Sequence, residues 1–280
     1  MTRDRRAGGR TKQRVTYAVL SLLLLWSLFP VYWMLVTSLK SNRDIYSRPG
    51  LVPTAPVLTH YRTTLFETHF LTFMRNSFLV AVATTATSIV VGSLAAYAIT
   101  RLRFVGRRWV ARSIIFVYLV PPALLFIPLF GVVHALGLAD TIYSLMLTYL
   151  TFTVPFCTWL LIGYFKTIPV EIAEAALVDG CGPVGTLWRI IVPLALPAMA
   201  VVALFSYTLS WNEFLYAMVF IGSDSQKTIT VGLAGLIMGD VFMWGQLMAA
   251  AVLGSLPAVL IYAISQRWVV SGLAVGGVKG

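Results

Sequence analysis

Residues Glu174 to Pro197 read EAALVDGCGPVGTLWRIIVPLALP, and the rest of the chain is organised around this stretch. Ala175 and Ala176 are strong helix formers with almost no bulk, so that another surface can approach them closely. The glycine pair that begins at Gly180 can end this helix, and Pro183 can begin a second one. The stretch therefore predicts two short helices joined by a glycine turn, with a small-faced surface suited to docking against a partner.

Composition indicates the class of protein. Hydrophobic residues make up 59% of the 280 residues and charged residues only 11%, whereas a soluble domain carries roughly 25% charged residues. These values indicate an integral membrane protein. The net charge of +11 is therefore interpreted as membrane topology and lipid contact, and a nucleic-acid partner is not expected.

Six apolar segments are each long enough to cross a hydrocarbon core of about 30 Å. They predict an all-α membrane protein with six transmembrane helices in a domain of residues 15–265. A basic tail, residues 1–14, precedes this domain and a second tail, residues 266–280, follows it. The loop 166–197 lies between the fourth and fifth spans. The expected spans are residues 15–36, 72–99, 109–132, 142–165, 198–221 and 243–265.

Basic residues are distributed unevenly between the two sides of this six-span arrangement. Fifteen of the 21 lysines and arginines fall in the tails and the connectors on one side, five fall on the other side, and Arg75 lies at a span edge. Cytoplasmic loops of membrane proteins carry an excess of lysine and arginine. Both termini and the loop 166–197 are therefore expected in the cytoplasm of a multi-pass membrane protein.

Glu213 is the acidic residue expected well inside a span. A carboxylate within a membrane is costly and usually faces a protein interior or a cavity. Asn212 adds hydrogen-bonding groups, while Trp211 and Tyr216 add aromatic faces with polar edges. These residues could line a path for a hydroxyl-rich solute, or Glu213 and Asn212 could hold helices together through hydrogen bonds. A proton relay at Glu213 is a third interpretation.

Motifs for several other chemistries are absent from the sequence. The chain contains no Gly-x-x-x-x-Gly-Lys-Ser/Thr phosphate loop, so any ATP hydrolysis must come from another polypeptide. His60, His69 and His134 lack the spacing of a zinc site, and the two cysteines form no metal motif. No catalytic residue, metal site or cofactor site is therefore predicted on this chain.

The quoted loop also resembles a known motif. The order of Glu174-Ala175-Ala176, Gly180, Ile190 and Pro193 resembles the EAA loop of ABC-importer permease subunits. In that family the loop docks into a groove on a separate ATPase subunit. Cys181 and Val192 depart from the usual alanine and leucine, but both are small or apolar. The resemblance implies an ATPase-coupling set of Glu174, Ala175, Ala176, Asp179, Gly180, Ile190 and Pro193, in which Asp179 either pairs with a basic partner residue or caps the turn.

Two further stretches carry the same resemblance. The second span ends in Gly92 to Ala98 (GSLAAYA) and Arg101 to Phe104 (RLRF), and the chain ends in Gly276 to Gly280 (GGVKG). They are similar to the corresponding parts of MalG-type carbohydrate ABC transporter permeases. The Trp-Asn-Glu run at Glu213 resembles the fifth-span segment of sugar-importer permeases.

This resemblance implies a permease subunit of an ATP-driven importer, not an enzyme, in the inner membrane of a bacterium. The chain would form half of the path for a sugar or related polyol. Its partners would be a MalF-like second permease subunit, an ABC ATPase dimer that holds ATP and magnesium, and an extracytoplasmic solute-binding protein. A secondary transporter or channel with an ion or proton site at Glu213 is the alternative hypothesis, which leaves the EAA-like loop unexplained.

Overall fold

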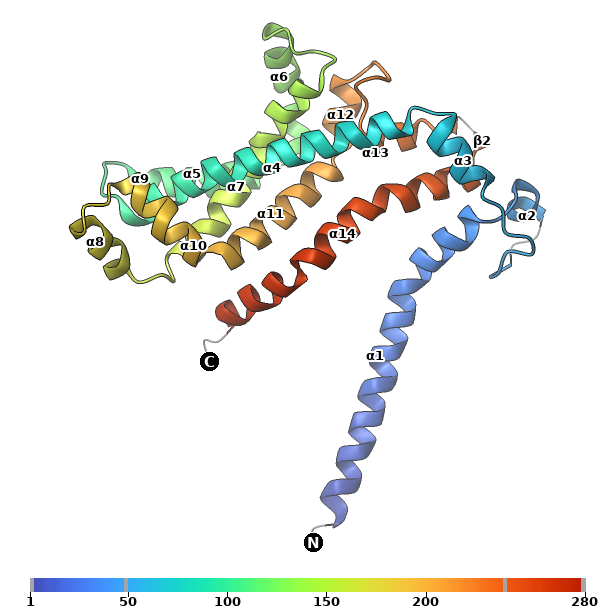
Figure 1. The fold of residues 1–280 in the computed structure, drawn as a ribbon, viewed down its shortest axis with the longest axis horizontal. Coiled ribbons are helices and arrows are strands. Elements are labelled where there is room, and N and C mark those ends of the chain that lie inside the picture. Colours follow the sequence, from blue (N-terminus) through green and yellow to red (C-terminus); the bar gives the residue numbers. More distant parts are fainter. Residues whose placement is uncertain (1–2, 48–49, 239–240, 278–280) are drawn as a thin grey trace. The chain divides into compact units, whose positions relative to one another are not determined.

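A computed structural model describes residues 3–47, 50–238 and 241–277 of the chain. Two compact units are present, the first formed by Met1–Thr68 with Leu236–Leu253 and the second by His69–Gly235 with Gly254–Gly280. Figure 1 shows the elements of both along the sequence.

The first unit is built around a long N-terminal helix, α1 (Arg3–Ser38). Its segment Gln13–Ser38 is predominantly apolar and mostly exposed, except at its C-terminal end, where Val36, Thr37 and Ser38 are buried. Lys40, just after α1, is buried, donates a hydrogen bond from Nζ to the Gly50 carbonyl and lies 5.1 Å from the centre of the Trp33 ring. The unit also contains α2 (Asn42–Ser47), α3 (Thr59–Phe66), the start of α14 (Trp244–Gly277) and two paired antiparallel strands, β1 (Ile237–Met238) and β2 (Val241–Phe242).

The second unit contains three long helices that pack on one another in pairs (Figure 1): α4 (Phe70–Arg101), α7 (Ile142–Phe165) and α11 (Leu196–Trp211). Gly92 allows α4 and α7 to approach closely, because a Cβ atom there would lie 3.0 Å from the Cβ of Cys157. Ser88 and Thr153 share a hydrogen bond of 2.7 Å across the same interface. Small residues and hydroxyl pairs of this kind are the usual means by which membrane helices associate.

The shorter elements of the second unit connect these helices. Two buried apolar clusters lie within the unit, one around Phe165 and Leu187 and the other around Tyr149 and Tyr216. The first cluster packs the loop between α7 and α11 against α4, and the second packs the N-terminal part of α7 against the segment after α11. The elements are α5 (Arg107–Leu119), α6 (Pro122–Ala135), α8 (Val170–Val178), α9 (Pro183–Thr186), η1 (Leu187–Ile191), α10 (Val192–Leu194), α12 (Leu215–Phe220) and α13 (Ile229–Ala234).

The prediction of an all-helical membrane protein is confirmed, with two short strands as the exception in the described part of the chain. Among the residues that the structure describes, four helices are long and apolar enough to cross a membrane: Gln13–Ser38, Phe70–Arg101, Ile142–Phe165 and Trp244–Gln266. Two bent helix pairs raise the number of candidate spans to six.

The third expected span, residues 109–132, is not one continuous helix. It is split into α5 and α6, which are bent by 100° relative to each other. Val120 and Pro121 both precede a proline, which disfavours helical backbone, and they have extended ψ angles of 122° and 125°. Pro121 and Pro122 also lack the amide hydrogens that would continue the helix. The two prolines therefore end α5 and allow α6 to begin in a new direction.

The fifth and sixth expected spans also have different bounds from those predicted. The fifth, residues 198–221, ends at Trp211, and the short helix α12 begins only at Leu215. The sixth was expected to end at residue 265, whereas α14 continues to Gly277. Residues 278–280 of the expected C-terminal tail lie outside the described residues.

Candidate functional site

The glycine turn of the loop 166–197 has the geometry that its sequence predicts. Gly180 has φ of +85°, a left-handed conformation that side chains rarely adopt. The Cys181 amide donates a 2.9 Å hydrogen bond to the Ala176 carbonyl, and the Gly180 amide donates one of 3.1 Å to the Leu177 carbonyl. These two bonds form a Schellman motif, which satisfies carbonyls at the end of α8. The turn is therefore a fixed end of α8. At the other end of α8, Pro169 directly precedes the first helical residue, Val170.

Helix α8 has one buried face and one exposed face. Ala173 and Ala176 are buried, whereas Glu174, Ala175 and Asp179 are exposed. Of the predicted coupling set, Gly180 and Pro193 are also exposed, and Ile190 is half-buried. Ala176 is the member of the set that contacts the interior of its own chain.

Apolar side chains extend the exposed face of α8 around the turn. Leu177, Val178 and Val184 are exposed by 45%, 88% and 63%. Exposed apolar side chains grouped beside polar ones mark interaction surfaces. We define Glu174, Ala175, Leu177, Val178, Asp179, Gly180 and Val184 as the coupling surface.

The second half of the loop departs from a regular helix. Residues Leu187–Ile191 form a π-helical turn, η1, in which the Val192 amide bonds to the Leu187 carbonyl. Pro193 has no amide hydrogen and cannot bond to the carbonyl four residues earlier. Helix residues Pro183–Leu194 then bend by 85° relative to α11. The second half of the loop therefore joins α11 through a sharp bend.

The C-terminal end of α4 is joined to this loop by Arg101. Its Nη2 atom donates hydrogen bonds of 2.7 Å to the Phe165 carbonyl and 2.5 Å to the Ile168 carbonyl. One turn earlier, Tyr97 is buried in the cluster that contains Leu187. In the sequence, Arg101 stood out only as part of the family-like stretch Arg101 to Phe104, and this contact was not predicted, since the acceptors are backbone atoms 64 and 67 residues away.

The predicted path residues lie at the break between α11 and α12. Glu213 is half-buried within this break, not inside a continuous helix as expected. Its carboxylate accepts hydrogen bonds from the Tyr216 amide at 2.8 Å, the Ala217 amide at 3.1 Å and the Tyr149 hydroxyl at 2.7 Å. The first two bonds cap the N-terminus of α12, where the helix dipole favours a negative charge. Glu213 thus makes the contacts expected of the helix-joining interpretation.

The other path residues are placed differently. Trp211 is 5% exposed and stacks on Tyr207, with ring centres 5.5 Å apart. Tyr216 is fully buried and donates a 2.8 Å hydrogen bond to the Pro122 carbonyl, which joins the two broken segments. Asn212 is exposed, and its side-chain amide donates to the Thr208 carbonyl at 2.9 Å. Asn212 is therefore the most accessible of the four.

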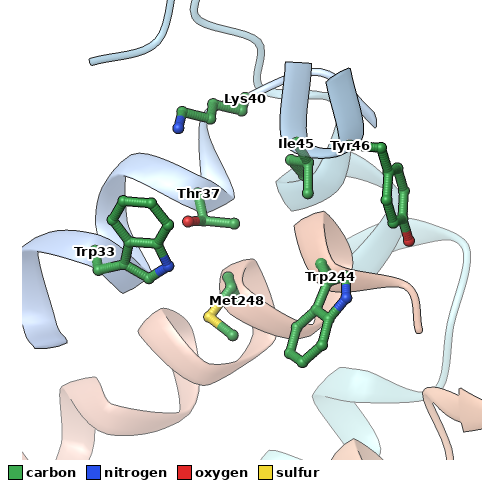
Figure 2. Close-up of a pocket in the computed structure, with 7 residues that line it drawn as sticks. All are labelled: Trp33, Thr37, Lys40, Ile45, Tyr46, Trp244 and Met248. Carbon is green, nitrogen blue, oxygen red and sulfur yellow. The ribbon is translucent and has the colours of Figure 1, made fainter. Parts of the chain in front are cut away.

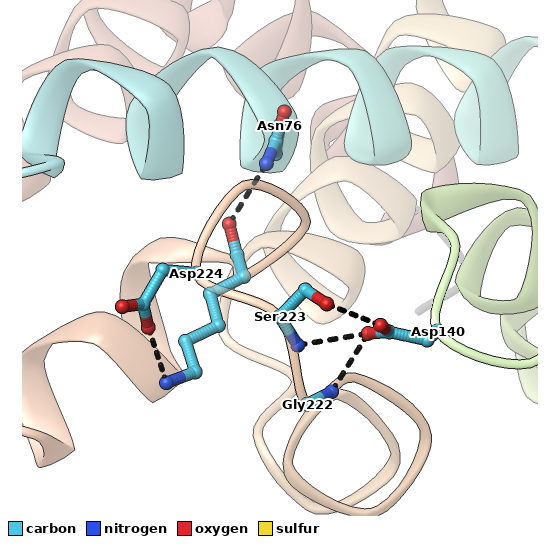
Figure 3. Close-up of polar contacts among 6 residues, drawn as sticks. Asn76, Asp140, Gly222, Ser223 and Asp224 are labelled. Atoms are coloured by element: carbon cyan, nitrogen blue, oxygen red, sulfur yellow. Dashed lines mark hydrogen bonds and ion pairs between the residues drawn. The ribbon is translucent and has the colours of Figure 1, made fainter.

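A polar turn follows α12 and is held by two other segments (Figure 3). Asp140 Oδ1 accepts hydrogen bonds of 2.9 Å from the amides of Gly222 and Ser223, and the Ser223 hydroxyl bonds to Oδ2. These bonds lower the pKa of the Asp140 carboxyl from its ordinary value, and the bond from the Ser223 hydroxyl makes the largest contribution. Asn76 of α4 donates to the carbonyls of Ser225 and Lys227 at 2.9 and 3.0 Å. The turn 222–227 is thereby fixed to α4 and to Asp140, which lies two residues before α7.

A cavity of about 260 Å³ lies in the first unit (Figure 2). The indole rings of Trp33 and Trp244 flank Met248 in its wall. It contains none of the residues predicted for coupling or for the path, and its lining is Trp33, Thr37, Lys40, Ile45, Tyr46, Trp244 and Met248. Across residues 3–47, 50–238 and 241–277, no three histidine, cysteine or acidic side chains gather as metal ligands would.

Comparison with known proteins identifies the family. Residues 88–275 match the family described as binding-protein-dependent transport system inner membrane component. The chain is 40% identical to the inner membrane ABC transporter permease protein YcjP of Escherichia coli strain K12, over 97% of this chain and 98% of that protein. It is 34% identical to the trehalose/maltose transport system permease protein MalG of Thermococcus litoralis, over 92% and 94% of the two chains.

A solved structure shares the fold. The structure of a bacterial ABC transporter involved in the import of the acidic polysaccharide alginate matches 94% of this chain and 98% of its own, with a TM-score of 0.81 at 23% identity. The prediction of a transport subunit is confirmed, and the secondary-transporter alternative is not favoured by this family. The chain belongs to the binding-protein-dependent transport system inner membrane components, and it is a multi-pass ABC transporter permease.

Proposed function

We propose that this chain forms half of the membrane path of an ATP-driven importer for a sugar or a related polyol. A second, MalF-like permease subunit supplies the other half, and an extracytoplasmic binding protein delivers the solute. An ABC ATPase dimer, which holds ATP and magnesium, drives the cycle from the cytoplasmic side. Both termini and the loop 166–197 lie in the cytoplasm of a bacterial cell, in accordance with the excess of basic residues in those segments.

The coupling surface is the observation that carries this proposal. Its exposed face combines Glu174 with apolar side chains such as Val178, while the opposite face of α8 packs on the same chain through Ala173. A rigid element with one anchored face and one free apolar face can receive a partner and pass its movement on. The neighbouring turn at Gly180 keeps the end of α8 in one conformation.

The names of the relatives support a carbohydrate as the solute. The Thermococcus litoralis relative is described as a trehalose/maltose transport protein, and SmoH of Agrobacterium fabrum, 37% identical over 93% of this chain, as a sulfoquinovosyl glycerol transport protein. Hydroxyl-rich solutes need hydrogen-bonding and aromatic groups along their path. The proposed path residues remain Trp211, Asn212, Glu213 and Tyr216, with the exposed Asn212 as the first candidate for contact.

Alternating access is the mechanism that this assembly implies. Closure of the ATPase dimer moves the coupling surface, and the loop passes this movement to α7 and α11, which it joins directly in the chain. A ligand or nucleotide can shift such an equilibrium only by binding one state more tightly than the other. In this importer, ATP and the solute-loaded binding protein are the ligands whose affinities differ between the two states.

Purification in mild detergent from the native membrane, followed by mass spectrometry, tests the proposal. We expect an ATPase and a second permease subunit to be recovered with the chain. Replacement of both Glu174 and Gly180 by alanine should remove the ATPase and leave the second permease in place. A chain recovered alone in several detergents would contradict the proposal.

A further inference from the structure

Arg101 binds the point at which α7 passes into the coupling loop. Phe165 is the last residue of α7, and Ile168 lies two residues before α8. Both of their carbonyls accept a hydrogen bond from Nη2 of Arg101, at 2.7 and 2.5 Å. A positive charge at the C-terminus of a helix also interacts favourably with the helix dipole. One side chain therefore joins the end of α4 to the entry of the loop.

The way in which Arg101 is held indicates that this contact has a use. The side chain is half-buried, and its Nε atom is buried without a hydrogen-bond partner. A buried donor left unpaired costs free energy. Arg103, two residues later, is exposed and supplies the same positive charge for membrane topology without that cost. Topology alone therefore gives no reason for a buried arginine at position 101.

Apolar packing extends the same junction. Tyr97, one turn before Arg101, is 4% exposed and belongs to the cluster that contains Ile168, Ala173 and Leu187. Ile168 and Ala173 come from the first half of the loop, and Leu187 comes from the second half. The last turn of α4 therefore contacts both halves of the loop, although α4 is not joined to the loop in the chain.

We propose that Arg101 is a positioning residue that fixes the coupling loop to α4. Movement of the loop then reaches three helices, α4, α7 and α11, and not only the two that the loop connects. This inference rests on the proposed coupling function. Without the two hydrogen bonds, movement of the loop reaches α4 only through the apolar cluster around Tyr97 and the packing of α4 on α7 and α11.

Hydrogen exchange of the purified importer complex, with and without magnesium and ATP, measures this link directly. Arg101→Met removes the guanidinium group, and with it both hydrogen bonds, and keeps an unbranched but shorter side chain. We expect ATP to change exchange in α4, α7 and α11 of the wild-type complex. In Arg101→Met the response of α4 should fall at least about tenfold, because the loss of even one charge-assisted hydrogen bond corresponds to a change of that size and two are lost, while α7 and α11 still respond. The matched control, Arg103→Met, should leave all three responses unchanged.

The outcomes separate this inference from the coupling function. A wild-type response of α4 in Arg101→Met would overturn the inference and leave the coupling function intact. If ATP changed hydrogen exchange in none of the three helices of the wild-type complex, that result would instead contradict the proposed coupling function. Should Arg101→Met fail to assemble, Arg101→Lys keeps the charge with a shorter reach. We expect an intermediate α4 response in Arg101→Lys, and a full response would again contradict the proposal.

Discussion

The hydroxyl of Tyr149 donates a 2.7 Å hydrogen bond to Glu213, which joins α7 to the break between α11 and α12. The same carboxylate caps α12 through two backbone amides. A single acidic side chain thus determines where a second helical segment begins and which long helix it contacts.

Loss of the hydrogen bonds to Glu213 should destabilise the segment around α12. Tyr149→Phe leaves the amide caps in place and should cost about 2 kcal/mol, the value of a hydrogen bond to a charged group. Glu213→Gln should cost more, because the amide nitrogen that replaces Oε2 cannot accept the hydrogen bonds from Tyr149 and Ala217. Thermal unfolding of the purified complex measures both. The double variant should lose less than the sum of the single losses, and strict additivity would contradict a direct contact.

Gly180 should tolerate asparagine but not alanine. Its φ of +85° lies in the left-handed region, where a Cβ costs about 1–2 kcal/mol and asparagine is the side chain best accepted. Gly180→Ala should therefore lower the amount of ATPase recovered with the chain about tenfold, while Gly180→Asn retains most of it. Gly185→Ala in the same loop is the control, because a Cβ there meets no atom within 4 Å. Equal recovery with all three variants would exclude a role for the turn geometry.

A larger residue at Gly92 should separate α4 from α7. A Cβ at this position already lies 3.0 Å from the Cβ of Cys157 and 3.3 Å from the Thr158 amide nitrogen. Overpacking of this kind typically costs about 1–3 kcal/mol. Gly92→Leu should therefore lower the thermal midpoint of the complex. Gly163→Ala in α7, which meets no atom within 4 Å, should maintain or raise it. An unchanged midpoint for Gly92→Leu would refute the close approach.

The Asp140 contacts should depend on pH. Hydrogen bonds from Ser223 and Gly222 lower the pKa of the Asp140 carboxyl in the folded state below its ordinary value of 3.8. The carboxylate therefore stabilises the turn at pH above 3.8, and this contribution is lost as the pH falls through the lowered folded-state pKa. The difference in thermal midpoint between the wild type and Asp140→Ala should be largest near neutral pH and shrink in acid. A difference in thermal midpoint that grows in acid would contradict this prediction.

The sequence predicted parts of the molecule that depend on local chemistry. The turn at Gly180 was predicted, because a glycine follows a short run of strong helix formers. The break at Pro121 was not predicted as a change of direction within the third span, although its cause, two consecutive prolines without amide hydrogens, is local. By contrast, the break at Glu213 could not be predicted, because no proline or glycine marks it in the sequence. It depends on contacts with Tyr149 and Thr230, which are distant in the chain. The Arg101 bridge joins residues more than sixty positions apart, and such pairings depend on the packing of α4 on α7.

Site-specific photocross-linking from Val178 tests the central claim most directly, since this residue is 88% exposed beside the turn of the coupling surface. Tyr143, which is 62% exposed at the other end of α7, provides the matched control. In the intact importer we expect a cross-link from Val178 to an ATPase subunit and none to it from Tyr143. A Val178 probe that never reaches an ATPase, in a complex that still imports solute, would contradict docking through this loop.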